Sequence, residues 1–410
     1  MFTRSDDELT GADSRHIIAS FSQPIYDCPA NMRTARWLML QVLCIASVLA
    51  TSKAQDVNRL LQPQNSQFKA PDAGNLIPAG TNADEAQRRK AVIASMQVVM
   101  GPMPTDERRV DLDVQIQKET SVGTYTRRLI TYQSEPGSRT PAYLCIPNRI
   151  LEEKGRAAAV LCLHPTDNTV GHKVVVGLGG RPGRQYAAEL AERGYVTLSP
   201  AYPHLANYWP NLGKLGYVSG TMKAIWDNSR GLDLLESLSF VDTSNGIAAI
   251  GHSLGGHNAI YTAVMDERIS VVASSCGFDS YRHYKNGDES LWYFGKGWCQ
   301  IRYMPRMSNY RGRLETIPFD FPDLLTALAP RPLFVNAPLH DTNFRWQSVD
   351  ACATAAEATY RRLGAEGKIT LKHPDCEHNF PKDMRHAAYL VIDSVLRPTA
   401  HSKKSSSLSQ

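Results

Sequence analysis

The stretch IAAIGHSLGGH, residues 247–257, decides the fold that we expect for this chain. An apolar run leads into Gly251 and small residues follow Gly255, so Ser253 is expected on a tight turn between a buried strand and a helix. Glycine at both positions removes side chains that would collide with the neighbouring strand or helix. The amide of Leu254, at the start of that helix, would then be free to stabilise an oxyanion. The stretch therefore predicts a serine nucleophile on an α/β fold.

The pattern around that stretch supports the prediction. G-x-S-x-G alone recurs by chance on the order of once in ten chains of this length. Between about residue 123 and residue 398, however, short β-rich runs alternate with amphipathic stretches, which is typical of a mostly parallel sheet flanked by helices. We expect one α/β domain over this range, with eight strands at 127–133, 142–147, 157–163, 195–199, 247–251, 271–275, 333–336 and 369–373.

Residues 277–328 interrupt this alternation with turn residues and aromatic side chains, among them Trp298 and Tyr303. The segment follows the sixth expected strand and is too long for a plain connection. We expect a lid over the strand ends, because long loops commonly carry function. The alternative is an extra structural excursion.

The two ends of the chain carry no chemical motif. The apolar run 37–50 follows two arginines and precedes a cleavage pattern ending at Ala54, which is typical of a secretory signal peptide. It is shorter than the roughly 20 residues that cross a bilayer, although an uncleaved anchor stays open. We expect the true start at Met32, with 1–31 an upstream extension and about 32–54 a cleaved signal peptide. A helical and irregular segment, 55–122, and a disordered tail, 399–410, would flank the domain of a secreted or periplasmic protein.

Composition excludes several partners. The 410 residues carry a formal net charge of only +5, and no Lys/Arg block alternates with aromatics, so neither nucleic acid nor an anionic membrane is expected as a partner. Six of the eight cysteines follow the signal peptide, several of them in apolar runs. We expect buried thiols there rather than a disulfide on which function depends.

A serine nucleophile needs a base, and the base needs an orienting acid, in the chain order Ser, Asp, His for this kind of fold. Asp341 follows the expected strand 333–336, and His378 follows the expected strand 369–373. Both strands would deliver these side chains to the sheet edge where Ser253 emerges. We therefore favour Asp341 as the acid and His378 as the base.

Competing residues exist for each role. Asp279 follows the strand after the nucleophile and is an alternative acid, while His340 and His373 are alternative bases. His373, Cys376 and His378 lie in one loop without a second ligand pair, which argues against a zinc site. The glycine-rich stretch 177–183 is similar to a dinucleotide-binding turn, but Pro182 occupies the third glycine position and no acidic residue follows the next strand. No metal or organic cofactor is expected.

Six segments together resemble the α/β-hydrolase superfamily and, within it, the dienelactone hydrolase and acetylxylan esterase-like bacterial branch. The resemblance covers about residues 123–398. The segments are PAYLCIPN at 141, LCLHPT at 161, GLGGRPGRQYAAELAERGYVTLSPAYP at 177, GHSLGGHNA at 251, APLHDTNF at 337 and HPDCEHNFP at 373.

This resemblance implies a catalytic triad of Ser253, Asp341 and His378, with Leu254 as one oxyanion donor. The chain departs from the family where many relatives have His-Gly after the third strand, because Pro165 has no N–H to donate. The second oxyanion donor is then best assigned to Thr166. Dienelactone hydrolases proper use a cysteine nucleophile, so the serine favours an esterase of the acetylxylan type.

The expected function is therefore that of a secreted serine esterase, which cleaves an acetyl or other acyl ester on a carbohydrate or small molecule through an acyl-enzyme. A prolyl-oligopeptidase-like peptidase is an alternative, although the segment before the domain is too short for a β-propeller. A non-enzymatic binding protein of the same fold is the other alternative.

Overall fold

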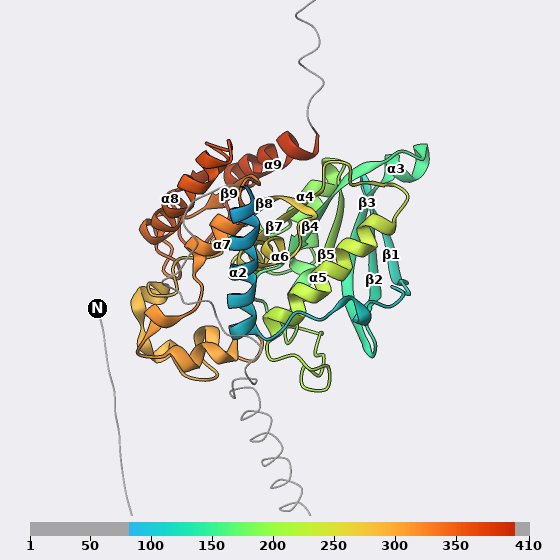
Figure 1. Ribbon diagram of the computed structural model, residues 1–410. Coiled ribbons are helices and arrows are strands. Elements are labelled where there is room, and N and C mark those ends of the chain that lie inside the picture. Colours follow the sequence, from blue (N-terminus) through green and yellow to red (C-terminus); the bar gives the residue numbers. More distant parts are fainter. Residues whose placement is uncertain (1–81, 398–410) are drawn as a thin grey trace, which may run out of the picture. The chain divides into compact units, whose positions relative to one another are not determined.

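A mixed sheet of ten strands lies at the centre of residues 82–397, the part of the chain that this computed structural model describes (Figure 1). The expected extension, signal peptide and tail, together with the first part of the 55–122 segment, lie outside the described residues. The strands are β1 (Gln115–Val122), β2 (Tyr125–Glu135), β3 (Ser138–Pro147), β4 (Ala157–Leu163), β5 (Val196–Pro200), β6 (Val241–Asp242), β7 (Ile247–His252), β8 (Ile269–Ser275), β9 (Leu333–Asn336) and β10 (Ile369–Lys372).

The strand order is β1-β2-β3-β5-β4-β7-β8-β9-β10, with β6 paired to β4 at the side. All neighbours from β5 to β10 are parallel, whereas β1, β2 and β3 join the sheet antiparallel. The α/β class and the mostly parallel sheet are thus confirmed. The expected number of eight strands is wrong, because β1 is mostly exposed and shows no apolar alternation, and β6 has only two residues.

Eight α-helices accompany the sheet in the described residues. They are α2 (Asn82–Met100), α3 (Asn148–Glu153), α4 (Tyr186–Glu192), α5 (Gly220–Ser237), α6 (Leu254–Met265), α7 (Phe321–Leu328), α8 (Trp346–Arg362) and α9 (Lys382–Leu396). None of them combines the length and the apolar character needed to cross a membrane.

The helices cover both faces of the sheet, because alternate residues of a strand point to opposite sides. In β4, Leu161 and Leu163 belong to the larger core, which α5 and α6 cover, whereas Val160 and Cys162 belong to the second core, which α4 and α9 cover. Helix α2 packs on α6 and α7 (Figure 1). Strands buried on both faces read as continuous apolar runs, which explains why the sequence located them well.

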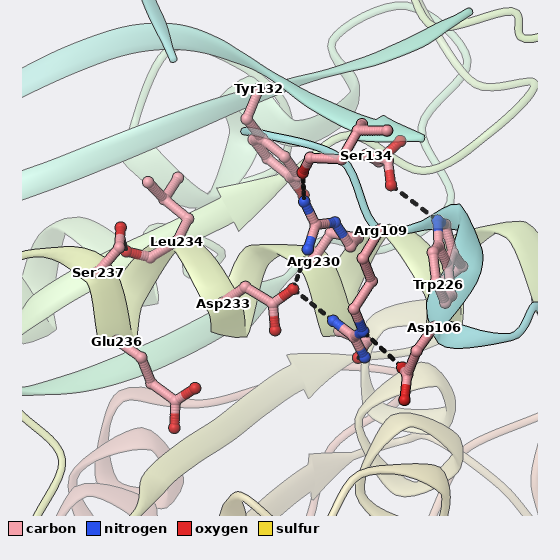
Figure 2. Close-up of polar contacts among 12 residues, drawn as sticks. Asp106, Arg109, Tyr132, Ser134, Trp226, Arg230, Asp233, Leu234, Glu236 and Ser237 are labelled. Atoms are coloured by element: carbon pink, nitrogen blue, oxygen red, sulfur yellow. Dashed lines mark hydrogen bonds and ion pairs between the residues drawn. The ribbon is translucent and has the colours of Figure 1, made fainter. Parts of the chain in front are cut away.

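Ionic contacts fasten the connection between α2 and β1 to the outer side of α5. Asp233 accepts hydrogen bonds from both Arg109 and Arg230, as Figure 2 shows, and from Arg268 at 2.7 Å. Deeper in the same helix, Lys223 is fully buried and contacts two buried carboxylates, Glu135 at 2.9 Å and Asp227 at 2.5 Å. Since Glu135 belongs to β2, this pair holds α5 on the sheet.

Five short 3₁₀ helices lie in the segment 277–328, where a lid was expected. They are η3 (Tyr284–Gly287), η4 (Glu289–Trp292), η5 (Gly297–Cys299), η6 (Pro305–Tyr310) and η7 (Leu314–Thr316). The last eight residues of the range form α7, which packs against α6 and α8 as a core helix. Whether the remainder moves as a lid stays a prediction.

Candidate active site

Ser253 lies at the junction of β7 and α6, on the turn that the sequence predicts. Its backbone is strained, with φ 54° and ψ −122°, a region that residues with side chains rarely adopt. A Cβ atom on Gly251 would lie 2.1 Å from the carbonyl carbon of Gly255, and one on Gly255 would lie 1.9 Å from the carbonyl oxygen of Leu163. Only glycine fits at both positions, so the G-x-S-x-G spacing is a steric requirement of this turn.

Two amide groups near Ser253 are available to a ligand. Helix α6 begins at Leu254, so the N–H of this residue belongs to the first helical turn, which has no acceptor within the helix. Thr166 lies in the loop after β4, and its hydroxyl is 2.9 Å from the hydroxyl of Tyr303. Neither the Leu254 amide nor the Thr166 amide donates to another residue in the described range 82–397.

Asp341 and His378 lie in direct contact. The Nδ1 atom of His378 donates to Oδ2 of Asp341 at 2.8 Å. The other carboxylate oxygen, Oδ1, accepts the amides of Asn343 at 2.7 Å and Phe344 at 3.2 Å, which fixes the orientation of the carboxylate. The Asp341 side chain is 1% exposed. This pair leaves Nε2 of His378 as the ring nitrogen that can accept a proton.

The structure brings His378 close to the nucleophile turn without joining it to the serine. The rings of His378 and His252, the residue before Ser253, have centroids 4.9 Å apart. Among the described residues, no hydrogen bond links the Ser253 hydroxyl to His378. Catalytic hydrogen bonds are commonly long without substrate and shorten in the complex, so this geometry is compatible with a triad. The roles of the three residues stay predictions.

A cavity of about 220 Å³ opens at Ser253. Its wall contains all three of the residues predicted as nucleophile and oxyanion donors, and otherwise consists of aromatic and uncharged polar side chains. The residues are Thr166, Ser253, Leu254, Tyr284, Gly297, Trp298, Gln300, Tyr303, Asn343 and Phe344. No Lys, Arg, Asp or Glu is among these wall residues.

Half of the cavity wall comes from the segment expected as a lid. Trp298 stacks on His257 of α6, with centroids 4.4 Å apart, and meets Tyr303 edge to face at 5.6 Å. The sequence singled out Trp298 and Tyr303 as aromatic residues of the expected lid. It did not single out Gln300 or Asn343, because an uncharged polar residue in a loop gives no local signal of its position.

The alternative acid and bases lie elsewhere. Asp279 is buried, and burial raises its pKa to about 8, but its carboxylate accepts the amide of Arg345 and does not contact His378. His340 pairs with the exposed Asp375 at 2.7 Å, and His373 donates to the carbonyl of Ala337. None of the three lines the cavity at Ser253.

The cysteines form no disulfide among the described residues, and the potential metal ligands gather at the candidate site. All six cysteines of the described residues are free. One group of three potential metal ligands occurs there, formed by Cys276, Asp341 and His378. Because Asp341 and His378 already bond each other, these atoms belong to the candidate catalytic site rather than to a separate centre.

Comparisons with known proteins point to esterases of this fold. A model of the family of fungal glucuronyl esterases matches residues 208–364. A 4-O-methyl-glucuronoyl methylesterase of Phanerochaete carnosa is 26% identical over 199 residues, which cover 42% of this chain and 45% of that protein, so the chain spans less than half the length of this relative. The Bacillus subtilis protein YtaP, described as a hydrolase, is 23% identical over 76% of this chain and 99% of its own length.

Solved structures agree with this fold. The glucuronoyl esterase of Solibacter usitatus superimposes with a TM-score of 0.59 at 17% identity, covering 79% of this chain and 96% of that one. The fold, the strained serine turn and these matches lead to one assignment. The chain has the α/β-hydrolase fold, as the resemblance of its sequence implies, and its matched segments are similar to esterases.

Proposed function

We propose that the chain is an exported serine esterase that cleaves a carboxylic ester of a carbohydrate, with a uronic acid as the acyl group. The observation that carries the proposal is the 2.8 Å contact between Asp341 and His378, beside a strained serine turn that opens into an aromatic cavity. The sequence led us to expect an acetyl or other acyl ester, without fixing the acyl group. The matched family and the fungal relative, both described by their action on glucuronoyl esters, favour the uronic acid ester instead.

In the proposed reaction, His378 takes the proton of Ser253 as the serine oxygen attacks the ester carbonyl. Asp341 holds the proton on Nδ1, so that Nε2 is the free acceptor, and stabilises the imidazolium that forms. The amides of Leu254 and Thr166 receive the oxyanion, and one such donor typically lowers the barrier by about 2.7–4 kcal/mol. His378 then protonates the leaving alcohol, and water clears the acyl-enzyme by the same steps.

The cavity wall supports a sugar as the substrate. Trp298 and Tyr303 offer flat apolar faces, which suit the C–H face of a sugar ring, while Gln300 and Asn343 can hydrogen-bond hydroxyl groups. An uncharged wall accepts a neutral ester without an ionic partner. Export rests on the predicted signal peptide alone, which lies outside the described residues.

The test uses the full-length chain, its Ser253→Ala variant and Ser394→Ala, a control on the exposed side of α9. A fluorophosphonate probe should label the wild type and the control, but not Ser253→Ala. The substrates are benzyl glucuronate, p-nitrophenyl acetate, acetylated xylan and a proline p-nitroanilide. We expect turnover of the glucuronate ester with the highest kcat/KM. Preferred cleavage of the anilide would indicate a peptidase, and labelling of Ser253→Ala would contradict the assigned nucleophile.

A further inference from the structure

Arg184 is a buried cation that takes no part in the proton transfers or the oxyanion contacts of the proposed reaction. It directly follows the glycine-rich stretch 177–183 and is 4% exposed. Burial lowers the pKa of its guanidinium. Within the described residues no carboxylate lies within ion-pair distance of it. Because a buried charge without a counter-ion is costly, the groups that Arg184 does bind indicate its role.

These groups belong to the backbone that carries the proposed base. Nη1 of Arg184 donates to Oδ1 of Asn379 at 2.7 Å, and Nη2 donates to the carbonyl of His378 at 3.4 Å. Asn379 Oδ1 also accepts the amide of Phe380 at 2.9 Å. The guanidinium therefore holds two consecutive residues at the point where the imidazole is attached.

The opposite side of Asn379 is held by the ends of two strands. The side-chain amide of Asn336, the last residue of β9, donates to the Asn379 carbonyl at 2.9 Å, and the Cys276 thiol donates to the same oxygen at 3.3 Å. With Arg184 on its side chain and Asn336 on its carbonyl, Asn379 is fixed from two directions. Within residues 82–397, the imidazole of His378 itself makes a single hydrogen bond, to Asp341.

The glycine-rich stretch lets Arg184 approach this closely. Gly183 has φ 77°, and a Cβ atom there would lie 3.1 Å from Nη1 of Arg385 and 3.5 Å from the carbonyl oxygen of Phe380. A side chain at this position would therefore be strained and would crowd the residues after His378. The stretch that is similar to a dinucleotide-binding turn in sequence thus serves the approach of Arg184 to the His378 loop.

We propose that Arg184 is a positioning residue for His378. Its guanidinium fixes the His378–Asn379 backbone so that the imidazole stays bonded to Asp341 and next to the Ser253 turn. This inference rests on the proposed function, because it assigns Arg184 to the same reaction. A small displacement of a catalytic group can reduce the rate by about 100-fold without weakening substrate binding, so the effect should appear in kcat and not in KM.

The test compares Arg184→Ala, Arg184→Lys, Asn379→Ala and the Arg184→Ala/Asn379→Ala double variant in the full-length chain. Arg331→Ala is the matched control, because among the described residues this mostly buried arginine likewise donates to uncharged oxygens only, the carbonyls of Ala263, Ile269 and Leu328. kcat and KM for p-nitrophenyl acetate are measured together with the thermal midpoint. We expect Arg184→Ala to lower kcat by about 10- to 100-fold with KM within about threefold.

Three further readouts separate positioning from loss of stability. Arg331→Ala should lower the thermal midpoint and leave kcat within about twofold, and the double variant should lose little more than either single variant, because both break the same contact. Millimolar guanidinium should restore part of the kcat of Arg184→Ala. If Arg184→Ala does not fold, Arg184→Lys and Asn379→Ala test the positioning role in its place, and each should lower kcat by about tenfold.

Equal kcat in the Arg184, Asn379 and Arg331 variants, or additive losses in the double variant, would overturn this inference alone. A wild-type chain that hydrolyses no ester would overturn the proposed function, and this inference with it.

Discussion

Replacing Asp341 with asparagine should abolish most of the activity without changing the fold. Oδ1 of Asp341 accepts two backbone amides, from Asn343 and Phe344, so the oxygen of an asparagine would occupy that place. Its NH₂ group would then face Nδ1 of His378, 2.8 Å away, where the carboxylate oxygen now lies. Nδ1 would have to accept this hydrogen bond, which puts the ring proton on Nε2 and removes the base that Ser253 needs.

The size of the effect follows from the same geometry. The imidazole keeps its position but is held in the wrong tautomer, a change that costs about 10⁴-fold in kcat in serine hydrolases built this way, or about 5.4 kcal/mol of barrier. Stability should change little, because the replacement has the same shape and keeps its two amide contacts.

The assay is steady-state hydrolysis of p-nitrophenyl acetate at neutral pH, with thermal unfolding measured in parallel. Asp375→Asn is the matched control, since it alters an Asp–His pair of similar length, 2.7 Å to His340, on the exposed surface. It should leave kcat within about twofold. If Asp341→Asn keeps more than about a tenth of the wild-type kcat, Asp341 is not the acid and the tautomer argument fails.

Three further outcomes test the cavity and the buried charges. Trp298→Ala should raise KM for benzyl glucuronate by about tenfold and leave KM for p-nitrophenyl acetate within about twofold, since stacking on one aromatic face contributes roughly 0.5–1.5 kcal/mol of binding free energy. Equal effects on both esters would argue against stacking of the sugar on Trp298. Lys223→Met should lower the free energy of unfolding in urea by about 3–5 kcal/mol, because Asp227 would be left buried without a cation and Glu135 would keep only Arg108 as its ionic partner. A loss below about 1 kcal/mol would contradict that. Burial raises the pKa of Asp279 to about 8, above that of an unfolded aspartate, so its protonated form stabilises the wild type in acid and this contribution is lost as the pH rises toward 8. The Asp279→Asn variant cannot ionise at this position, so its free energy of unfolding relative to the wild type should increase by roughly a few kcal/mol between about pH 4 and about pH 8. Urea unfolding of both proteins across this range measures the difference. A difference that does not change with pH would show that Asp279 ionises freely.

The sequence located those parts of the fold that burial determines. Strands β4 and β9 begin and end where their apolar runs do, because both faces of these strands lie in the core. The sequence did not predict strand β1. This strand pairs with β2 through backbone hydrogen bonds and leaves its side chains exposed, so it has no apolar pattern. Chain position alone indicated the contact between Asp341 and His378, because each follows one of two neighbouring parallel strands.

Site residues whose position depends on contacts between distant parts of the chain could not be predicted from local sequence patterns. Arg184 lies almost 200 residues before His378 in the chain, and nothing in its local pattern distinguishes it from an exposed arginine. Gln300 and Asn343 reach the cavity only because their loops fold over the end of β7. Their assignment needs the path of the chain, which depends on packing between distant segments.

The position of the cavity follows from the order of the strands. Thr166, Ser253, Asp341 and His378 follow β4, β7, β9 and β10, which lie in this order in the parallel part of the sheet, so all four emerge at the same edge. The segment between β8 and α7 starts at that edge too, and it provides the aromatic wall for this reason. Register then becomes critical, because a slip of β10 by one residue against β9 would move His378 by about 3.3 Å and turn the strand's side chains to the other face. A displacement of that size would break the 2.8 Å bond to Asp341, so the pairing of Leu371 with Val335 that sets the register is as necessary to this contact as the two side chains themselves.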